Sequence, residues 1–150
     1  MRPALSIIVP VLNEAEHIEA TLGGLAPLRQ RGVEVLVVDG GSHDDTLRLA
    51  RAQKPAVWTA PRGRARQMNA GAAQAQAEVL LFLHADTTLP PDADRLVRHA
   101  INAGAAWGRF DVHITGKAWL LRVVAALMNA RSRWSGIATG DQALFVRRDV

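Results

Sequence analysis

The chain has no cysteine, which excludes a disulfide framework and a zinc site built on thiolates. It also has no apolar run that approaches the length of a membrane-spanning helix, which needs about 18 residues. The amino terminus reaches its first apolar stretch at once, without the three-part layout of a secretory signal. These absences predict a cytoplasmic protein that does not cross a membrane.

Several common enzyme motifs are missing as well. No GxGxxG follows the first apolar run, so the fingerprint of a dinucleotide-binding domain is absent. There is no GxxxxGK[ST] phosphate-binding loop and no GxSxG nucleophile elbow. A Ser/His/Asp hydrolase is therefore not supported.

The composition is that of one ordinary globular domain. The 150 residues are 49% apolar and 21% charged, which is too apolar for a disordered chain and sufficient to bury a core. The formal charge is +4, with local density only at Arg62, Arg64 and Arg66. This balance favours anionic partners such as phosphates, but the scattered charges do not indicate nucleic acid. Composition predicts nothing about the oligomeric state.

Short apolar runs alternate with helical segments along the first part of the chain. Each run is unbroken, as is typical of a strand buried on both faces. Successive β-α units predict an α/β fold with a mostly parallel central sheet flanked by helices. The expected strands are 4–11, 33–41, 56–60 and 78–86, and the expected helices are 13–32, 42–53 and 62–77.

The remaining residues continue this pattern. The last expected strand lies in 140–150, where a domain of this kind would not normally end, so we expect residues 1–150 to be a single domain that lacks its carboxyl-terminal part. Helix 117–134 either packs on the sheet or rests on an anionic membrane surface through its flanking Lys and Arg residues. The other expected elements are helix 92–104 and a less regular strand in 105–115.

Polar residues follow the predicted strands, at the edge where open parallel sheets bind ligands. Glu14 and Asp39 can accept hydrogen bonds from a ribose hydroxyl or from the imide N–H of a base. Ser42, the expected N-cap with Asp45 three residues on, opens a helix whose first N–H groups favour anions. The loops expected to gather there are 10–14, 39–45, 62–69 and 84–86.

Charged residues of the later loops suit a diphosphate and a metal ion. Arg62 and Arg64 can pair with phosphates in a bidentate manner. Asp86 supplies the hard oxygen that Mg²⁺ or Mn²⁺ prefers, and a diphosphate supplies more. Plainer alternatives exist: a helix-dipole acid at Glu14, a turn former at Asp39, a solvated face for the arginines, a partly buried His84 and a turn cap at Asp86.

Five segments resemble, in order, the family 2 glycosyltransferases with a GT-A fold: SIIVPVLNE, VVDGGSHDDT, GRARQMNAG, LFLHADT and GDQALFVRR. The strongest similarity is to a small bacterial subgroup with VDGGS, RGRARQMN, LHADT and GDQ. The resemblance implies inverting transfer from a UDP- or GDP-sugar to an unknown acceptor hydroxyl, with Mn²⁺ or Mg²⁺ as cofactor. Family 2 enzymes often use lipid-linked acceptors, so contact with the inner face of a membrane is also implied.

The resemblance assigns roles to individual residues. Asp86 is the metal-binding acid of the DxD element, and His84 takes the place of its first acid, where it is a second metal candidate. Asp141 is the catalytic base, although in isolation it also suits a turn cap after Gly140. Gly40 stands where a second Asp is common, and the QxxRW motif of processive synthases is not seen. The implied nucleotide-sugar contacts are Pro10, Glu14, Asp39, Arg62, Arg64, Asn69, Ala85 and Asp86.

Two other functions stay open. A nucleotidyltransferase also uses such a sheet with acids and a metal, but it would need a basic, Gly-rich first loop, and PVLNEAEH is neither. A non-catalytic nucleotide-sugar-binding module would keep the sheet, although Asp86 and Asp141 are both present.

Overall fold

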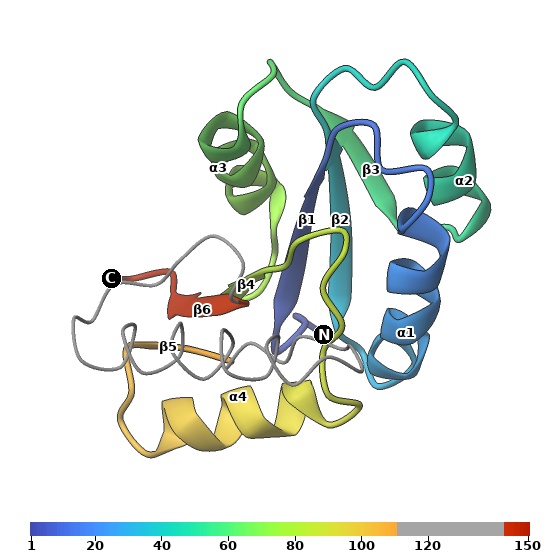
Figure 1. The fold of residues 1–150 in the computed structure, drawn as a ribbon. Helices are drawn as coiled ribbons and strands as arrows, with labels where there is room; N and C mark the ends of the chain where they lie inside the picture. Colours follow the sequence, from blue (N-terminus) through green and yellow to red (C-terminus); the bar gives the residue numbers. More distant parts are fainter. Residues whose placement is uncertain (111–142) are drawn as a thin grey trace, which may run out of the picture.

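The computed structural model describes residues 1–110 and 143–150, which form one six-stranded sheet with helices on both faces (Figure 1). The predicted helix over residues 117–134 and the predicted base Asp141 lie outside the described residues. Within the described part, no helix is long and apolar enough to span a bilayer. The elements are β1 (Ser6–Val11), α1 (Ile18–Gln30), β2 (Glu34–Asp39), α2 (Thr46–Ala52), β3 (Ala56–Thr59), α3 (Arg64–Gln74), β4 (Val79–Phe82), α4 (Ala93–Asn102), β5 (Trp107–Arg109) and β6 (Leu144–Arg147).

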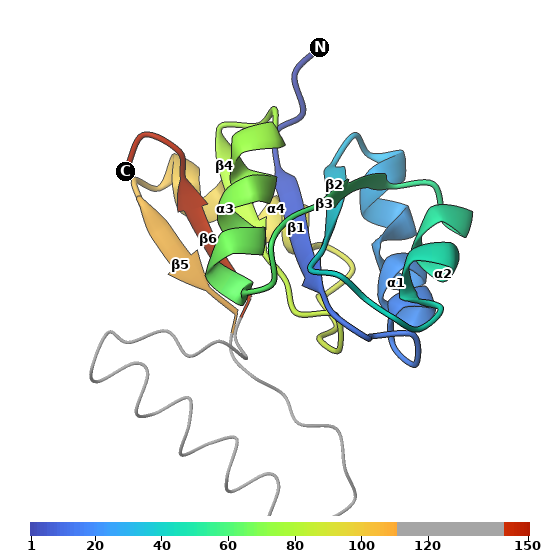
Figure 2. The same ribbon diagram turned by 90° about the horizontal axis from the view of Figure 1, so that it is seen from above.

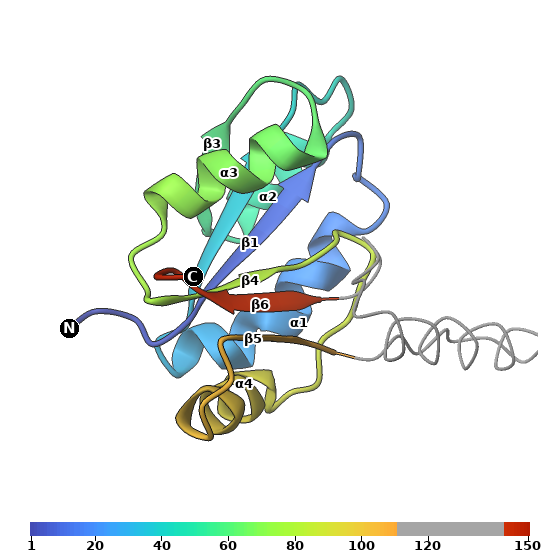
Figure 3. The same ribbon diagram turned by 90° about the vertical axis from the view of Figure 1, so that its left-hand side faces the viewer.

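The strand order is β3-β2-β1-β4-β6-β5, which confirms the mostly parallel sheet. β1 pairs in parallel with both β2 and β4, and β2 pairs in parallel with β3. β6 lies between β4 and β5 and is antiparallel to both (Figure 3). Where β5 ends and β6 begins, Phe110 N donates a hydrogen bond to Ala143 O over 2.9 Å. The final strand predicted from the sequence is therefore present, and its direction is opposite to that of β4.

Each face of the sheet has its own hydrophobic core. Alternate residues of β1 point to opposite faces, so Ile7 and Val9 pack in the larger core with α1 and α4, while Ile8 packs in the smaller core beneath α3 (Figure 2). Burial on both faces explains why the strands read as unbroken apolar runs.

Two predicted helices, α1 and α2, begin four or more residues later than expected. α2 begins at Thr46 with Asp45 at its N-cap, so the prediction that Ser42 caps this helix was wrong. The physical reason is that both the N–H and the hydroxyl of Ser42 donate to Asp39. α1 begins at Ile18, because a bend at residues 12–13 and a turn at residues 15–17 precede it.

Gly71 allows α3 to lie directly on β1 and β2. A Cβ at this position would lie 2.5 Å from Ile8 Cγ2 and 3.0 Å from Val38 Cγ2. Because those side chains are fixed in buried strands, Gly71→Ala is expected to lower the free energy of unfolding by about 1–3 kcal/mol, measured by urea denaturation.

The matched control is Gly23→Ala in α1, where a Cβ would meet no atom within 4 Å. This variant should be as stable as the parent chain or more so, since Ala is the better helix former by about 1 kcal/mol. If the two substitutions change stability in the same direction, the close packing of α3 does not limit residue 71.

Candidate functional site

The strand order reverses at β1, because β2 lies on one side of it and β4 on the other. In open α/β sheets the crevice at such a switch point is the usual place for a ligand. The ladder between β1 and β4 ends where Leu83 N donates to Ile8 O over 2.9 Å. Pro10 lies beyond that bond and has no N–H to continue the ladder, so the two strands can separate.

A cavity of about 250 Å³ lies at this switch point. Sites for whole small molecules usually measure about 300–1,000 Å³, so the described residues enclose a space suited to part of a nucleotide-sugar. Five of the predicted site residues line the cavity, and Asp39, Asn69, Ala85 and Asp86 do not. The lining residues are Pro10, Val11, Leu12, Glu14, Arg62, Gly63, Arg64, Gln67 and His84.

Asp39 lies at the predicted edge, but its carboxylate is directed into its own loop. The residue is 1% exposed. One oxygen accepts hydrogen bonds from Gly41 N (2.9 Å) and Ser42 N (3.1 Å), and the other accepts from Ser42 Oγ (2.5 Å). These bonds correspond to the turn-forming alternative.

Two loops at this edge are tied together by hydrogen bonds. Asn13 N donates to Ser42 Oγ (2.9 Å), and His43 N donates back to Asn13 Oδ1 (2.8 Å). Glu14 N donates to Thr46 Oγ1 over 2.8 Å. This network fixes the backbone of Glu14, whose side chain is 25% exposed and lies 3.2 Å from His17 Nδ1, from which it can accept a hydrogen bond. Glu14 thus keeps a carboxylate at the cavity wall.

The hydroxyl of Thr46 also donates to Asp44, and this bond holds the pKa of the Asp44 carboxyl below its usual range. Asp44 Oδ2 accepts a further bond from Ala15 N over 3.2 Å. The carboxylate is therefore ionised at neutral pH and helps to hold the first loop against the start of α2.

His84 lies between Arg64 and Asp86 at the end of β4. Its Nε2 contacts the Arg64 guanidinium, which can only donate. Its Nδ1 lies 3.3 Å from Asp86 Oδ1 and makes no hydrogen bond to any described residue. Asp86 is 58% exposed, so its carboxylate is open to a ligand. In the described part of the chain no three acids and histidines gather closely enough to hold a metal by themselves.

Two further predicted contacts lie away from the cavity. Ala85 is fully buried in the larger core, and its carbonyl accepts a hydrogen bond from the hydroxyl of Thr21 in α1. Asn69 is exposed on α3. Ala85 therefore fixes the path of the chain between His84 and Asp86.

Sequence reasoning missed Gln67, the one polar side chain of α3 that lines the cavity and is buried, at 3% exposure. Its Nε2 donates to Val11 O (2.8 Å) and to Val38 O (2.9 Å), which joins the ends of β1 and β2. Its spacing of four from Gly71, and of eight from Ala75, places it on the sheet-facing side of the helix. That periodicity could have shown that Gln67 is buried.

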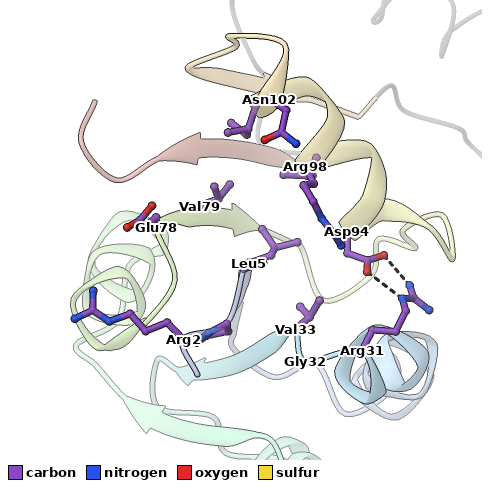
Figure 4. Close-up of a pocket in the computed structure, with 14 residues that line it drawn as sticks. Arg2, Leu5, Arg31, Gly32, Val33, Glu78, Val79, Asp94, Arg98 and Asn102 are labelled. Atoms are coloured by element: carbon purple, nitrogen blue, oxygen red, sulfur yellow. Dashed lines mark hydrogen bonds and ion pairs between the residues drawn. The ribbon is translucent and has the colours of Figure 1, made fainter.

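A second cavity of about 350 Å³ lies at the opposite edge of the sheet, where the strands begin (Figure 4). Leu5, Val33 and Val79 line it. At its side Arg31 makes a two-pronged pair with Asp94 (2.9 and 2.7 Å), which holds the pKa of the Asp94 carboxyl below its usual range. This pair joins α1 to α4, and the amino-terminal edge is not where such sheets bind substrates. We therefore assign the candidate site to the smaller cavity.

Comparison with known proteins identifies the family and the fold of the chain. The family model described as "Glycosyl transferase family 2" matches residues 6–146. A PGL/p-HBAD biosynthesis glycosyltransferase of Mycobacterium bovis is 37% identical over 152 residues, covering 97% of this chain and 56% of that protein. The succinoglycan biosynthesis protein ExoA of Rhizobium meliloti is 36% identical over 109 residues, covering 66% of this chain and 33% of that protein. The chain thus spans about half or less of the length of these relatives.

Solved structures share the fold. A mannosyltransferase from Pyrobaculum calidifontis, in complex with GDP-Man and Mn²⁺, superposes with a TM-score of 0.71 at 25% identity, covering 99% of this chain and 46% of that one. Glucosyl-3-phosphoglycerate synthase from Mycobacterium tuberculosis gives 0.70 at 20% identity, covering 98% of this chain and 57% of that one. The sheet and its flanking helices therefore form a GT-A-like domain.

Proposed function

Because the chain belongs to glycosyl transferase family 2, we propose that it moves a sugar from a nucleoside-diphosphate-sugar to an acceptor hydroxyl. The observation that carries this proposal is the cavity at the switch point, which is lined by the acid Glu14 and by Arg62 and Arg64. Apolar walls with one carboxylate suit a nucleoside, and guanidinium groups at the rim suit its phosphates.

The two arginines would bind the diphosphate. Both are exposed and lie just before or at the start of α3, whose first N–H groups also favour an anion. Charge that develops on the leaving diphosphate would then be stabilised by groups already in place, which is where electrostatic catalysis contributes most.

A divalent cation would bind at Asp86, with His84 as its second candidate ligand. His84 Nδ1 and Asp86 Oδ1 are 3.3 Å apart, close to the roughly 3 Å between adjacent ligands of an octahedral ion. An imidazole with a carboxylate favours Mn²⁺ over Mg²⁺, and the Pyrobaculum mannosyltransferase was solved with Mn²⁺. A bound cation would neutralise the diphosphate.

The contact with Arg64 determines whether His84 can bind the metal ion. While Arg64 donates to Nε2, the proton of a neutral imidazole stays on Nδ1, and that nitrogen cannot bind a metal ion. A diphosphate that attracts Arg64 would free Nε2 and allow the proton to move. Asp86 therefore serves as the metal ligand in either case, and His84 serves only when a donor is bound.

For the general base we propose Asp141, with inversion at the sugar carbon. Support comes from the register of β6: Leu144, three residues after Asp141, pairs with Phe82 at the carboxyl end of β4. The chain therefore enters β6 at the same sheet edge as His84. A carboxylate that takes the acceptor proton would complete a single displacement.

Family membership favours sugar transfer over nucleotidyl transfer, and it leaves donor and acceptor unspecified. The proposed donor is a UDP- or GDP-sugar, and the acceptor is unknown, with a lipid-linked hydroxyl as one candidate. Contact with the inner face of a membrane would be made by residues 117–134, which join an apolar face to flanking Lys and Arg residues.

Calorimetric titration with UDP, GDP, CDP and ADP, each with Mn²⁺ and with chelator, tests the proposal. We expect UDP or GDP to bind in the micromolar range, and at least tenfold more weakly in chelator. If none of the four nucleotides binds, the chain is not the donor-binding domain that we propose. Binding without transfer by the full-length protein would instead favour the non-catalytic module.

A further inference from the structure

The strongest unassigned feature is the buried amide of Gln67 on the inner side of the cavity. The residue is 3% exposed, so its amide is largely shielded from bulk water. Each carbonyl that it contacts, Val11 O and Val38 O, can only accept a hydrogen bond. The nitrogen of the amide must therefore face these carbonyls, and the orientation of Gln67 is fixed by chemistry.

This orientation leaves Oε1 as the only polar atom of Gln67 that a ligand can use. No described residue donates a hydrogen bond to Oε1. The amide rests against Gly40, where an added Cβ would lie 2.7 Å from Oε1 and 2.8 Å from the amide carbon. Any side chain at position 40 would displace the amide, so the absence of an acid there makes room for Gln67.

We propose that Gln67 Oε1 is the acceptor that recognises the base of the nucleotide through its ring N–H. This inference rests on the proposed function and specifies its donor. The diphosphate of a nucleotide-sugar carries no hydrogen to donate at neutral pH, so Oε1 would repel it and the diphosphate would lie at Arg62 and Arg64. The walls beside Gln67 are the apolar Pro10, Val11 and Leu12, which suit a flat heterocycle better than a ribose.

The required ligand is a base with a ring N–H beside its carbonyl groups, as in the imide of uracil or the lactam of guanine. Cytosine and adenine have no such hydrogen, since their ring nitrogens on that edge accept. A methyl group on the ring nitrogen would remove the donor and press carbon against a buried oxygen. Leaving that acceptor without a partner is costly because water cannot replace the bond.

The test compares UDP with 3-methyluridine diphosphate, and GDP with 1-methylguanosine diphosphate, by calorimetry on the purified chain. For whichever parent nucleotide binds, methylation should weaken binding about tenfold or more. Equal affinity of parent and methylated nucleotide would overturn the role of Gln67 while leaving nucleotide binding intact. If neither parent binds, this inference and the proposed function both fail.

Two variants assign the effect to Gln67. In Gln67→Met the parent and methylated nucleotides should bind equally, and Gly40→Ala should reduce the discrimination by displacing the amide. Gln74→Met, the same change at an exposed position of α3, is the matched control and should keep the full discrimination. Discrimination that survives in Gln67→Met, or that depends on the 2′-hydroxyl of the ribose instead of the ring N–H, would overturn the proposal.

Discussion

Replacing Asp141 with Asn is expected to lower the rate of sugar transfer by about 10²–10⁴-fold and to leave nucleotide affinity nearly unchanged. Asparagine keeps the size of the side chain and much of its hydrogen bonding, but it cannot accept a proton from the acceptor hydroxyl. The substitution therefore removes general-base catalysis without changing the donor cavity, whose described lining residues lie between Pro10 and His84 in the sequence.

Single-turnover transfer assays on the full-length protein, together with calorimetry for the donor, would measure the two effects separately. Asp149→Asn is the matched control, because Asp149 is an exposed acid after β6 that pairs only with Arg147 among the described residues. Transfer at the parent rate by Asp141→Asn would show that another group takes the proton. A weaker donor affinity with unchanged turnover would make Asp141 a substrate-positioning residue.

Replacing Asp86 with Ala should remove most of the metal-dependent part of nucleotide binding. In the parent chain we expect Mn²⁺ to strengthen UDP or GDP binding at least tenfold, and in Asp86→Ala the titrations with Mn²⁺ and with chelator should coincide. The reason is that Asp86 is the only exposed carboxylate within reach of His84 among the described residues. A divalent ion between protein and diphosphate needs at least one such hard ligand.

His84→Ala separates the two candidate ligands. If its effect on metal-dependent binding is small, Asp86 holds the cation without the imidazole. Asp149→Ala should leave binding unchanged, since that acid lies away from the cavity. Binding by Asp86→Ala that still improves with Mn²⁺ as much as in the parent chain would refute the role of Asp86.

The sequence predicted the sheet well because its strands are buried on both faces and therefore form unbroken apolar runs. The polar residues that end these runs lie at the carboxyl edge of the sheet as predicted, as Asp39 and His84 show. The direction of β6 could not be predicted, since it depends on which neighbour the strand pairs with and not on the composition of Leu144–Arg147.

The side chains of the site were less predictable than its position. Asp39 has the same sequence context whether it faces a ligand or its own loop, and only the bonds to Gly41 and Ser42 decide between the two. The predicted start of α2 was wrong for a similar reason. The side chain of Ser42 could bond either to the first N–H groups of the helix or to Asp39, and it bonds to Asp39. Gln67 was overlooked because polar residues are mostly exposed, and its burial depends on the approach of α3 that Gly71 permits.

The bond from Phe110 N to Ala143 O has a consequence for how such enzymes diversify. Phe110 and Ala143, which flank residues 111–142, are hydrogen-bonded where β5 and β6 pair. The sheet therefore already holds together the two points that this segment connects. The entropy of closing a loop grows slowly with length, by about 0.6 kcal/mol for each doubling. Relatives can therefore lengthen, shorten or exchange this segment at little cost to folding. Such changes would leave the cavity on β1, β2, α3 and β4 as it is, because none of its described lining residues belongs to that segment.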